Sequence, residues 1–456
     1  MLKFKLTPIA SAFLLMAATH VMAADSVTNQ LQVGEGNDAF SLQDSSFNES
    51  TINQTQSGSF NANYADQTNE NGSIVNQLQS GQMNDNFASQ LDGVGNTINQ
   101  TQISPAGIDS FNSTTSFQTG QTAATATINQ VGTNHIAVTE QDNFLGGTTA
   151  NNEARIEQSG DGNYGTISQS DQTDSSVSIF QGDGLNTAQV GQNEGRSSNT
   201  EVYQSGDTND ALVFQDFQDG SDALVVQSGA LNFAGIDQNG DGTVFNDNSA
   251  SIAQTGMGNQ TEISQFQTSG STAIAGVDGS GNQQYVYQTG SGHSASVATI
   301  GNDNLIQMGN TVTVGITDGG QDGTGQTAEL AQVGDGNSMT VAQAGSSNEL
   351  YFTQNGNDNI LIAEQRGDSN VAEGYTGGDL NTVELNQSGD GNYANTFQGD
   401  LSDNNTITIT QSGVSSNAYV AQLGSGNSAD VLQTGTNGLA NVSQSGTANI
   451  AVVQQH

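Results

Sequence analysis

The stretch QVGDGNSMTVAQAGSSNELYFTQNGNDNILIAEQRGD, residues Gln332–Asp368, decides the fold. Glutamine recurs in it every 11 residues, with glycine two places and asparagine five places after each glutamine. The repeated positions are Gln332, Gln343, Gln354 and Gln365, then Gly334, Gly345, Gly356 and Gly367, then Asn337, Asn348, Asn359 and Asn370. So strict a period in polar residues predicts a repeat architecture.

The period extends over most of the chain. It runs from Gln321 to Gln398 with Thr376 in one glutamine position, and it resumes at Gln411 after two extra residues. Further amide positions are Asn381, Gln387, Asn392, Gln398, Gln411, Gln422, Asn427, Gln433, Gln444, Asn449 and Gln455, and further glycines are Gly378, Gly389, Gly424 and Gly446. Earlier copies begin at Gln32, Gln56, Gln79, Gln158, Gln204, Gln227 and Gln254. The regions around 91–157, 239–253, 266–276 and 308–318 depart from the period, and insertions such as residues 103–117 are expected to loop out between rungs.

Each unit has the pattern of a half-buried strand. From Asn427, alternate positions are Asn427, Ala429, Val431 and Gln433, with polar or small residues mostly between them. Alternation of period two predicts a strand whose inward face ends in asparagine and glutamine. An 11-residue period also occurs in right-handed coiled coils, but the recurring Gly, Asn and Thr disfavour helix.

The fold class predicted is an all-β, cross-β-like β-solenoid. Glycine followed by small or polar residues marks a tight turn, so two 11-residue half repeats make one rung of about 22 residues. On the order of 20 rungs at ~4.8 Å each would give a rod roughly 95 Å long. Stacked glutamines and asparagines would form amide ladders, each side chain donating to one neighbour and accepting from the other.

Composition and the N-terminus limit the possible functions. Only 33% of the 456 residues are hydrophobic, and the chain has no Cys. Lys3, Lys5, an apolar run over residues 6–18 and small residues before position 24 predict a secretory signal peptide cleaved after Ala23. That run is too short to span a bilayer, which needs ~20 apolar residues, and no later segment could cross as a helix.

The mature chain is strongly acidic. It keeps three arginines against 46 acidic residues, a net charge of −43, which excludes phosphate and nucleic-acid binding. The domain prediction is a signal peptide at 1–23, degenerate repeats with inserted loops at 24–320 and regular repeats at 321–456, in one continuous solenoid.

The repeat resembles the curlin repeat of curli amyloid subunits, Ser-x5-Gln-x4-Asn-x5-Gln, which often adds Gly after the first Gln and Ala after the Asn. The best copies are Gln387-Gly389-Asn392-Ala394-Gln398, Gln422-Gly424-Asn427-Ala429-Gln433 and Gln444-Gly446-Asn449-Ala451-Gln455. Ser416 fills the serine position before Gln422, whereas Asn381 stands there before Gln387. This chain departs from the family in having several times more repeats and no Gly-rich leader before Gln32.

The resemblance implies a secreted structural subunit of an extracellular amyloid fibre in the biofilm matrix, with roles in adhesion and aggregation. Its partners would be further copies of itself, a nucleator subunit and a dedicated outer-membrane secretion pore. The final repeat ends at Gln455 with nothing visible to cap it, which favours end-to-end growth. The alternative is a monomeric solenoid adhesin or an ice- or ligand-binding protein with outward Thr rows, hinted at by NTVTVGIT (310–317) and NNTITITQ (404–411).

No residues are predicted to be catalytic, and no cofactor is expected. Most acids fall in turns or on outward positions, and His135 and His293 occupy asparagine positions of the repeat. Asp237, Asn239 and Asp241 partly match an EF-hand loop, but Asn248 replaces its bidentate glutamate, so this calcium site is a weak candidate. GDGNYG at 160–165 fits Gly-x-Gly-x-x-Gly without a βαβ context and is attributed to the repeat turn.

Overall fold

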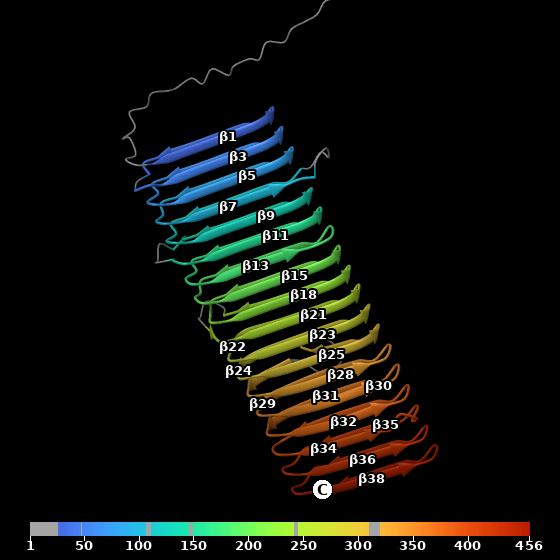
Figure 1. The fold of residues 1–456 in the computed structure, drawn as a ribbon. Helices are drawn as coiled ribbons and strands as arrows, with labels where there is room; N and C mark the ends of the chain where they lie inside the picture. The colour runs from blue at the N-terminus through green and yellow to red at the C-terminus, as the bar shows by residue number, and fades with distance from the viewer. Residues whose placement is uncertain (1–25, 47, 106–110, 146–148, 241–244, 310–319) are drawn as a thin grey trace, which may run out of the picture.

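The chain forms a β-solenoid of two parallel sheets, as the repeat predicts. The structure is a computed structural model that describes residues 26–46, 48–105, 111–145, 149–240, 245–309 and 320–456. The predicted signal peptide therefore lies outside the described residues. Each turn of the chain adds one strand to each sheet, and Figure 1 shows the turns stacked into a straight rod from β1 to β38. At ~4.8 Å between strands, the 18 strands of one sheet span roughly 85 Å.

The first sheet, sheet A, has 18 strands, each hydrogen-bonded in parallel to the next in its stack. In stacking order they are β1 (Val27–Glu35), β3 (Thr51–Ser59), β5 (Ile74–Gln82), β7 (Thr97–Ile103), β9 (Thr125–Thr133), β11 (Glu153–Asp161), β13 (Ser176–Gln181), β15 (Asn199–Asp207), β18 (Asp222–Ala230), β21 (Ser249–Met257), β23 (Thr272–Ser280), β25 (Ser294–Asn302), β28 (Thr327–Val333), β30 (Glu349–Asn355), β32 (Val371–Gly377), β34 (Tyr393–Gln398), β36 (Asn417–Leu423) and β38 (Leu439–Ser445).

Sheet B covers the other face of the core. Its strands are β2 (Asp38–Asp44), β4 (Ala62–Thr68), β6 (Asp85–Leu91), β8 (Ser113–Thr119), β10 (Ile136–Asp142), β12 (Tyr164–Ser170), β14 (Thr187–Asn193), β16 (Asp210–Asp216), β19 (Phe233–Asn239), β22 (Gln260–Ser269), β24 (Gln283–Ser291), β26 (Leu305–Met308), β27 (Gly320–Thr324), β29 (Ser338–Ser346), β31 (Ile360–Asp368), β33 (Thr382–Ser388), β35 (Thr406–Gln411), β37 (Ser428–Gln433) and β39 (Ile450–Gln455). β26 and β27 share one rung, because both pair with β24 and β29. A corner pair, β17 (Gln218–Asp219) and β20 (Phe245–Asn246), lies outside both sheets.

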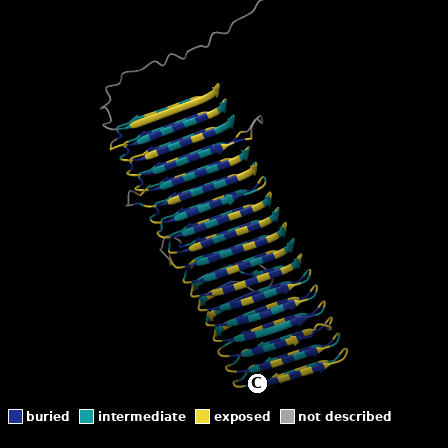
Figure 2. Cartoon of the chain, in the orientation of Figure 1, coloured by how far each residue is buried: buried dark blue, intermediate teal, exposed yellow. Residues whose placement is uncertain are grey.

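Alternation of burial fixes the register. In β33, for example, Val383, Leu385 and Gln387 are buried while the residues between them are not, and Figure 2 shows this alternation along the rod. A slip of one residue would turn the inward set outward, so strands align by equivalent repeat positions. Gln332 accordingly lies opposite Gln354 in the β28–β30 pair.

The expectation that residues 103–117 loop out is wrong for their second half. Residues 113–117 begin strand β8, which pairs with β6 and β10. The extra residues lengthen the rung at one corner, so that Gln102 bonds to Gln130, 28 residues later, and the strands then continue in register. The irregular region 91–157 therefore contains ordinary rungs whose spacing is longer than 22 residues.

The core changes character along the rod. From Ile128 to Val442 most inward residues between the amide positions form one continuous apolar cluster, in which alanine is frequent, and Thr139, Thr200, Thr261, Gln284 and Thr396 are buried polar exceptions. A separate small apolar cluster, from Ile52 to Ala126, belongs to the N-terminal rungs. There a second inward column is polar and consists of Gln30, Gln54, Gln77 and Gln100.

In the described part of the chain, no helix has the length and hydropathy needed to cross a membrane.

Candidate functional site

An uninterrupted glutamine ladder runs the length of sheet B. Nε2 of each glutamine donates to Oε1 of the glutamine in the next rung at 2.7–3.0 Å. Its members are Gln43, Gln67, Gln90, Gln118, Gln141, Gln169, Gln192, Gln215, Gln238, Gln265, Gln288, Gln321, Gln343, Gln365, Gln387, Gln411, Gln433 and Gln455. All donate in the same direction along the rod, so the ladder has a polarity.

The ladder also ties the two sheets together. Nε2 of Gln343 donates both to Gln365 Oε1 at 2.8 Å and to the carbonyl oxygen of Thr327 in sheet A at 2.9 Å. Both N–H bonds of the buried amide are thereby used, which removes the cost of burying them.

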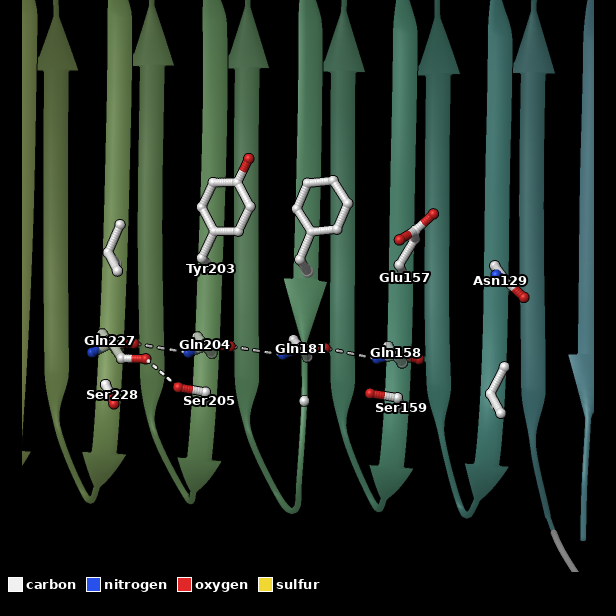
Figure 3. Close-up of a pocket in the computed structure, with 14 residues that line it drawn as sticks. Asn129, Glu157, Gln158, Ser159, Gln181, Tyr203, Gln204, Ser205, Gln227 and Ser228 are labelled. Carbon is white, nitrogen blue, oxygen red and sulfur yellow. Dashed lines mark hydrogen bonds between the residues drawn. The ribbon is translucent and has the colours of Figure 1, made fainter.

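Sheet A carries a second glutamine ladder, which is interrupted. Figure 3 shows the segment from Gln158 through Gln181 and Gln204 to Gln227, linked at 2.8–2.9 Å. Val277, Thr299 and Thr376 occupy glutamine positions further along this column. The interruption leaves one side-chain acceptor unsatisfied. Oε1 of Gln332, the next glutamine after Thr299, is buried without a hydrogen-bond partner.

The asparagines form two further ladders, one at each corner of the rung. At the corner that enters sheet A, the backbone N–H of Asn370 donates to Oδ1 of Asn348 at 3.0 Å. Asn337 and Asn359 lie at the corner that enters sheet B. The backbone N–H of Asn359 donates to Oδ1 of Asn337 at 3.0 Å, and Nδ2 of Asn337 donates to the carbonyl oxygen of Gly356 at 2.8 Å. Each asparagine thus binds the backbone of the following rung at two points. This satisfies corner peptide groups that no strand pairing reaches.

The structure places the predicted amide residues on these columns. All are buried except Asn449 and Gln455, which are half-buried in the last rung. The predicted glycines all have positive φ, namely Gly334, Gly345, Gly356, Gly367, Gly378, Gly389, Gly424 and Gly446. Gly345 and Gly367 lie within β29 and β31 rather than in the turn that follows.

The two internal histidines substitute for corner amides. Nδ1 of His135 accepts from the backbone N–H of Asn163 at 3.3 Å, and Nε2 faces the carbonyl oxygen of Val131 at 3.4 Å. His293 makes the equivalent contacts with Gln326 and Thr289. Burial lowers the pKa of both imidazoles, so both are neutral at pH 7 and function as amide substitutes.

The weak calcium candidate does not form a loop in its described part. Asp237 and Asn239 lie in strand β19, and Asp241 lies outside the described residues. Burial, followed by the charge of Asp216, raises the pKa of Asp237. Among the described residues, no group of three or more His, Cys, Asp or Glu side chains could hold a metal ion.

Sequence reasoning missed two sets of residues. The first is the polar column Gln30, Gln54, Gln77 and Gln100, for which the recurring Asn-Gln-x-Gln at 29–32, 53–56, 76–79 and 99–102 was an available signal. The second is Glu70, a fully buried carboxyl that accepts from Ser73 Oγ at 2.6 Å. Burial raises the pKa of Glu70.

Both ends of the described rod are open strand edges. β1 pairs with β3 and β2 with β4, while β38 pairs with β36 and β39 with β37, each on one side. All residues of β1 are exposed, and Ile450 and Val452 of β39 are 80% and 60% exposed. Open edges of parallel strands present unpaired backbone N–H and C=O groups to another chain.

The outward threonines of β35 do not continue onto the next strand of sheet B. Thr406, Thr408 and Thr410 lie on β35, but the neighbouring positions on β37 are Ser428, Asp430 and Leu432. The other Thr-rich stretch, 310–317, lies outside the described residues.

These features define a class: a parallel β-solenoid with amide ladders and open edges at both described ends. The family model described as the curlin associated repeat matches residues 149–181 and 403–435. The chain is therefore a curlin-repeat protein, and its matched segments cover parts of both its N-terminal and C-terminal halves. Among curated proteins, no match to the chain was found. The curlin repeat and the β-solenoid fold point to a structural protein rather than an enzyme.

Proposed function

We propose that this protein is a secreted structural subunit that self-assembles end to end into curli-like extracellular amyloid fibres. The observation that carries the proposal is the uninterrupted sheet B ladder, which reaches an open strand edge at each end of the described rod. A further copy stacked on either edge would continue the ladder and both sheets with the geometry already present between rungs. The curlin associated repeat supports a curli-like role in biofilm matrix and adhesion.

The energetics favour addition at the ends over contacts at the sides. An added rung would pair the backbone of two strands and remove the inward side chains of β38 and β39 from water. The outward faces of the rod carry carboxylates such as Glu329 on β28 and Glu373 on β32, on either side of Tyr351 on β30, and these charges repel other copies.

The family resemblance also suggests the route and the partners. We assign export through the periplasm and a curli-type outer-membrane pore, and a nucleator subunit that starts the fibre at the cell surface. The predicted signal peptide at residues 1–23 fits that route.

Fibre formation by the purified mature chain, residues 24–456, tests the proposal. Electron microscopy is expected to show fibres that bind amyloid dyes, with fibre reflections near 4.7–4.8 Å and ~10 Å. A chain that stays monomeric for days without binding dye would overturn it, and sugar-binding or ice-growth activity in that monomer would favour a monomeric binding protein instead.

A matched pair of variants in β39 sharpens this test. Val453 faces inward and Val452 outward on the same strand. Val453→Asp places a charge on the inward side of the edge and is expected to block fibre growth, whereas Val452→Asp leaves the inward face intact. Equal growth by both variants would contradict assembly through this edge.

A further inference from the structure

The first and last rungs carry their amides at the same spacing. The three amides of each rung follow one another at steps of five and then six positions, and they are Gln32, Asn37 and Gln43 in the first rung and Gln444, Asn449 and Gln455 in the last. Both strands of one end can therefore meet both strands of the other with equivalent repeat positions opposed. This register rests on the end-to-end assembly proposed above.

The polarity of the ladders selects one order of stacking. Nε2 of Gln455 uses one N–H on the carbonyl oxygen of Leu439 at 2.8 Å, and its second N–H faces the open edge. At the other end Nε2 of Gln43 donates to Gln67 at 2.7 Å, so its Oε1 faces the opposite open edge. The last rung of one copy thus offers donors to the acceptors of the first rung of the next.

The same register matches an outward amide column. Nδ2 of Asn29 donates to Oδ1 of Asn53 at 2.8 Å, and the column continues through Asn76 to Asn99. Placing Gln444 opposite Gln32 puts Asn441 opposite Asn29, where its Nδ2 is positioned to donate to Oδ1 of Asn29. The joint therefore extends this column by one more amide.

One inward pair does not match. In this register Val442 lies opposite Gln30, whose Nε2 donates to Gln54 Oε1 at 2.7 Å and to Ser41 Oγ at 3.1 Å. Both N–H bonds of Gln30 are used within its own copy, so its Oε1 needs a donor from the docking rung. A valine side chain has none, and a buried acceptor without a partner is destabilising.

At the other end of this polar column, the last glutamine finds its hydrogen-bond partners within the same chain. Gln100 is its last glutamine, and Ile128 follows it on the next strand. Nε2 of Gln100 donates instead to Ser116 Oγ at 3.1 Å and to the carbonyl oxygen of Phe87 at 2.6 Å. The chain thus supplies a partner where the column ends, and lacks one where the column begins.

We propose that copies join with Gln444 on Gln32 and Gln455 on Gln43, and that the Val442–Gln30 contact makes this joint weaker than a junction between rungs of one chain. Gln30 is then the specificity-determining residue of the N-terminal edge. It favours a docking rung with a hydrogen-bond donor at the position of Val442.

Val442→Thr tests the proposal because threonine has nearly the shape of valine and adds a hydroxyl donor. The same column already contains a buried threonine, Thr396, two rungs away. Val420→Thr is the matched control, since it makes the same change one rung inside the chain, where the hydroxyl cannot reach the joint. The critical concentration for fibre formation is measured for both, with circular dichroism to verify the fold.

Val442→Thr is expected to lower the critical concentration about tenfold relative to Val420→Thr, which corresponds to about 1.4 kcal/mol. Equal critical concentrations for two folded variants would overturn the proposed joint while leaving self-assembly intact. Absence of fibres from the unmodified chain would overturn both.

Discussion

The backbone at Gly345 lies directly against that of Gly367 in the next rung, so that a Cβ atom on Gly345 would stand 2.2 Å from the carbonyl oxygen of Gly367. The same contact recurs up the rod, since a Cβ atom on Gly367 would stand 2.3 Å from the carbonyl oxygen of Gly389. These glycines allow the corners to stack as closely as the strands do.

Gly345→Ala is therefore expected to destabilise the fold by about 2–3 kcal/mol, through backbone clash and a φ of +112° that alanine rarely adopts. Gly276→Ala is the control, because a Cβ atom at Gly276 meets nothing within 4 Å and its φ is ordinary. Chemical unfolding of both variants checks this, and similar losses at the two positions would contradict a role for close corner stacking.

Gln343→Leu is expected to lower the free energy of unfolding by about 2–3 kcal/mol, because it leaves the donor of Gln321 and the acceptor of Gln365 buried without partners. The same change at Gln283, an exposed outward glutamine of sheet B, is expected to have little effect. Equal free energies of unfolding for Gln343→Leu and Gln283→Leu would show that the hydrogen bonds of the ladder add no stability beyond the packing of its side chains.

Glu70→Gln is expected to stabilise the fold by about 1–2 kcal/mol at pH 7. Glu70 accepts from Ser73 as Gln172 accepts from Ser175 and Gln218 from Ser221, so glutamine fits this corner. Burial raises the pKa of Glu70, so the folded state favours the protonated acid, and the penalty grows as pH rises above about 4.5, the ordinary pKa, and is complete above the raised pKa.

The pH dependence of that gain is the diagnostic measurement. The advantage of Glu70→Gln is expected to shrink as pH falls and to vanish below about 4.5, the ordinary pKa, where the carboxyl is protonated in both states. Thermal unfolding at pH 7 and pH 4 checks this. A gain of equal size at both pH values would rule out ionisation as its cause.

His135→Asn is expected to protect the fold against acid. Burial lowers the pKa of His135, so the stability that depends on the neutral imidazole is complete above about 6.5 and is lost as pH falls through the lowered pKa. Asparagine, the usual residue of this corner, has no such transition. The difference in thermal midpoint between variant and unmodified chain should thus be larger at pH 5 than at pH 7.5, and a difference independent of pH would contradict the assignment.

Fibre assembly is expected to be faster at pH 4 than at pH 7 in low salt. The mature chain has 46 acidic residues against three arginines, so protonation reduces the repulsion between copies, and Ca²⁺ should act in the same direction. Burial also raises the pKa of carboxyls such as Asp85 and Asp210, which adds stability as pH falls through those raised values. Equal lag times at the two pH values would contradict this expectation.

The sequence predicts the rungs wherever the period is strict. For the unit that contains Gln343 and Asn348, alternation of period two and a fixed 11-residue spacing leave one register for the strand. Gln118 was not identified, because the residues added after Gln102 change the spacing while the strand itself is ordinary.

The period of the sequence could not predict the burial of side chains at the corners between strands. Glu70 lies between strands, where period two does not apply, and its burial depends on Gly93 in the next rung leaving room for its carboxylate. The proposed joint likewise depends on which strand edges remain open, a property of the assembled rod. Whether the division at residue 320 separates two functional parts of the repeat array stays a prediction.

The uniform direction of the sheet B ladder has an electrical consequence. Every glutamine side-chain dipole in it points the same way along the rod, whereas the dipoles of strands largely cancel within a sheet. The side-chain dipoles of the ladder therefore add, in the manner of peptide dipoles in a helix. Two such rods lying side by side have lower electrostatic energy when they point in opposite directions, so bundles of them would favour alternating orientation.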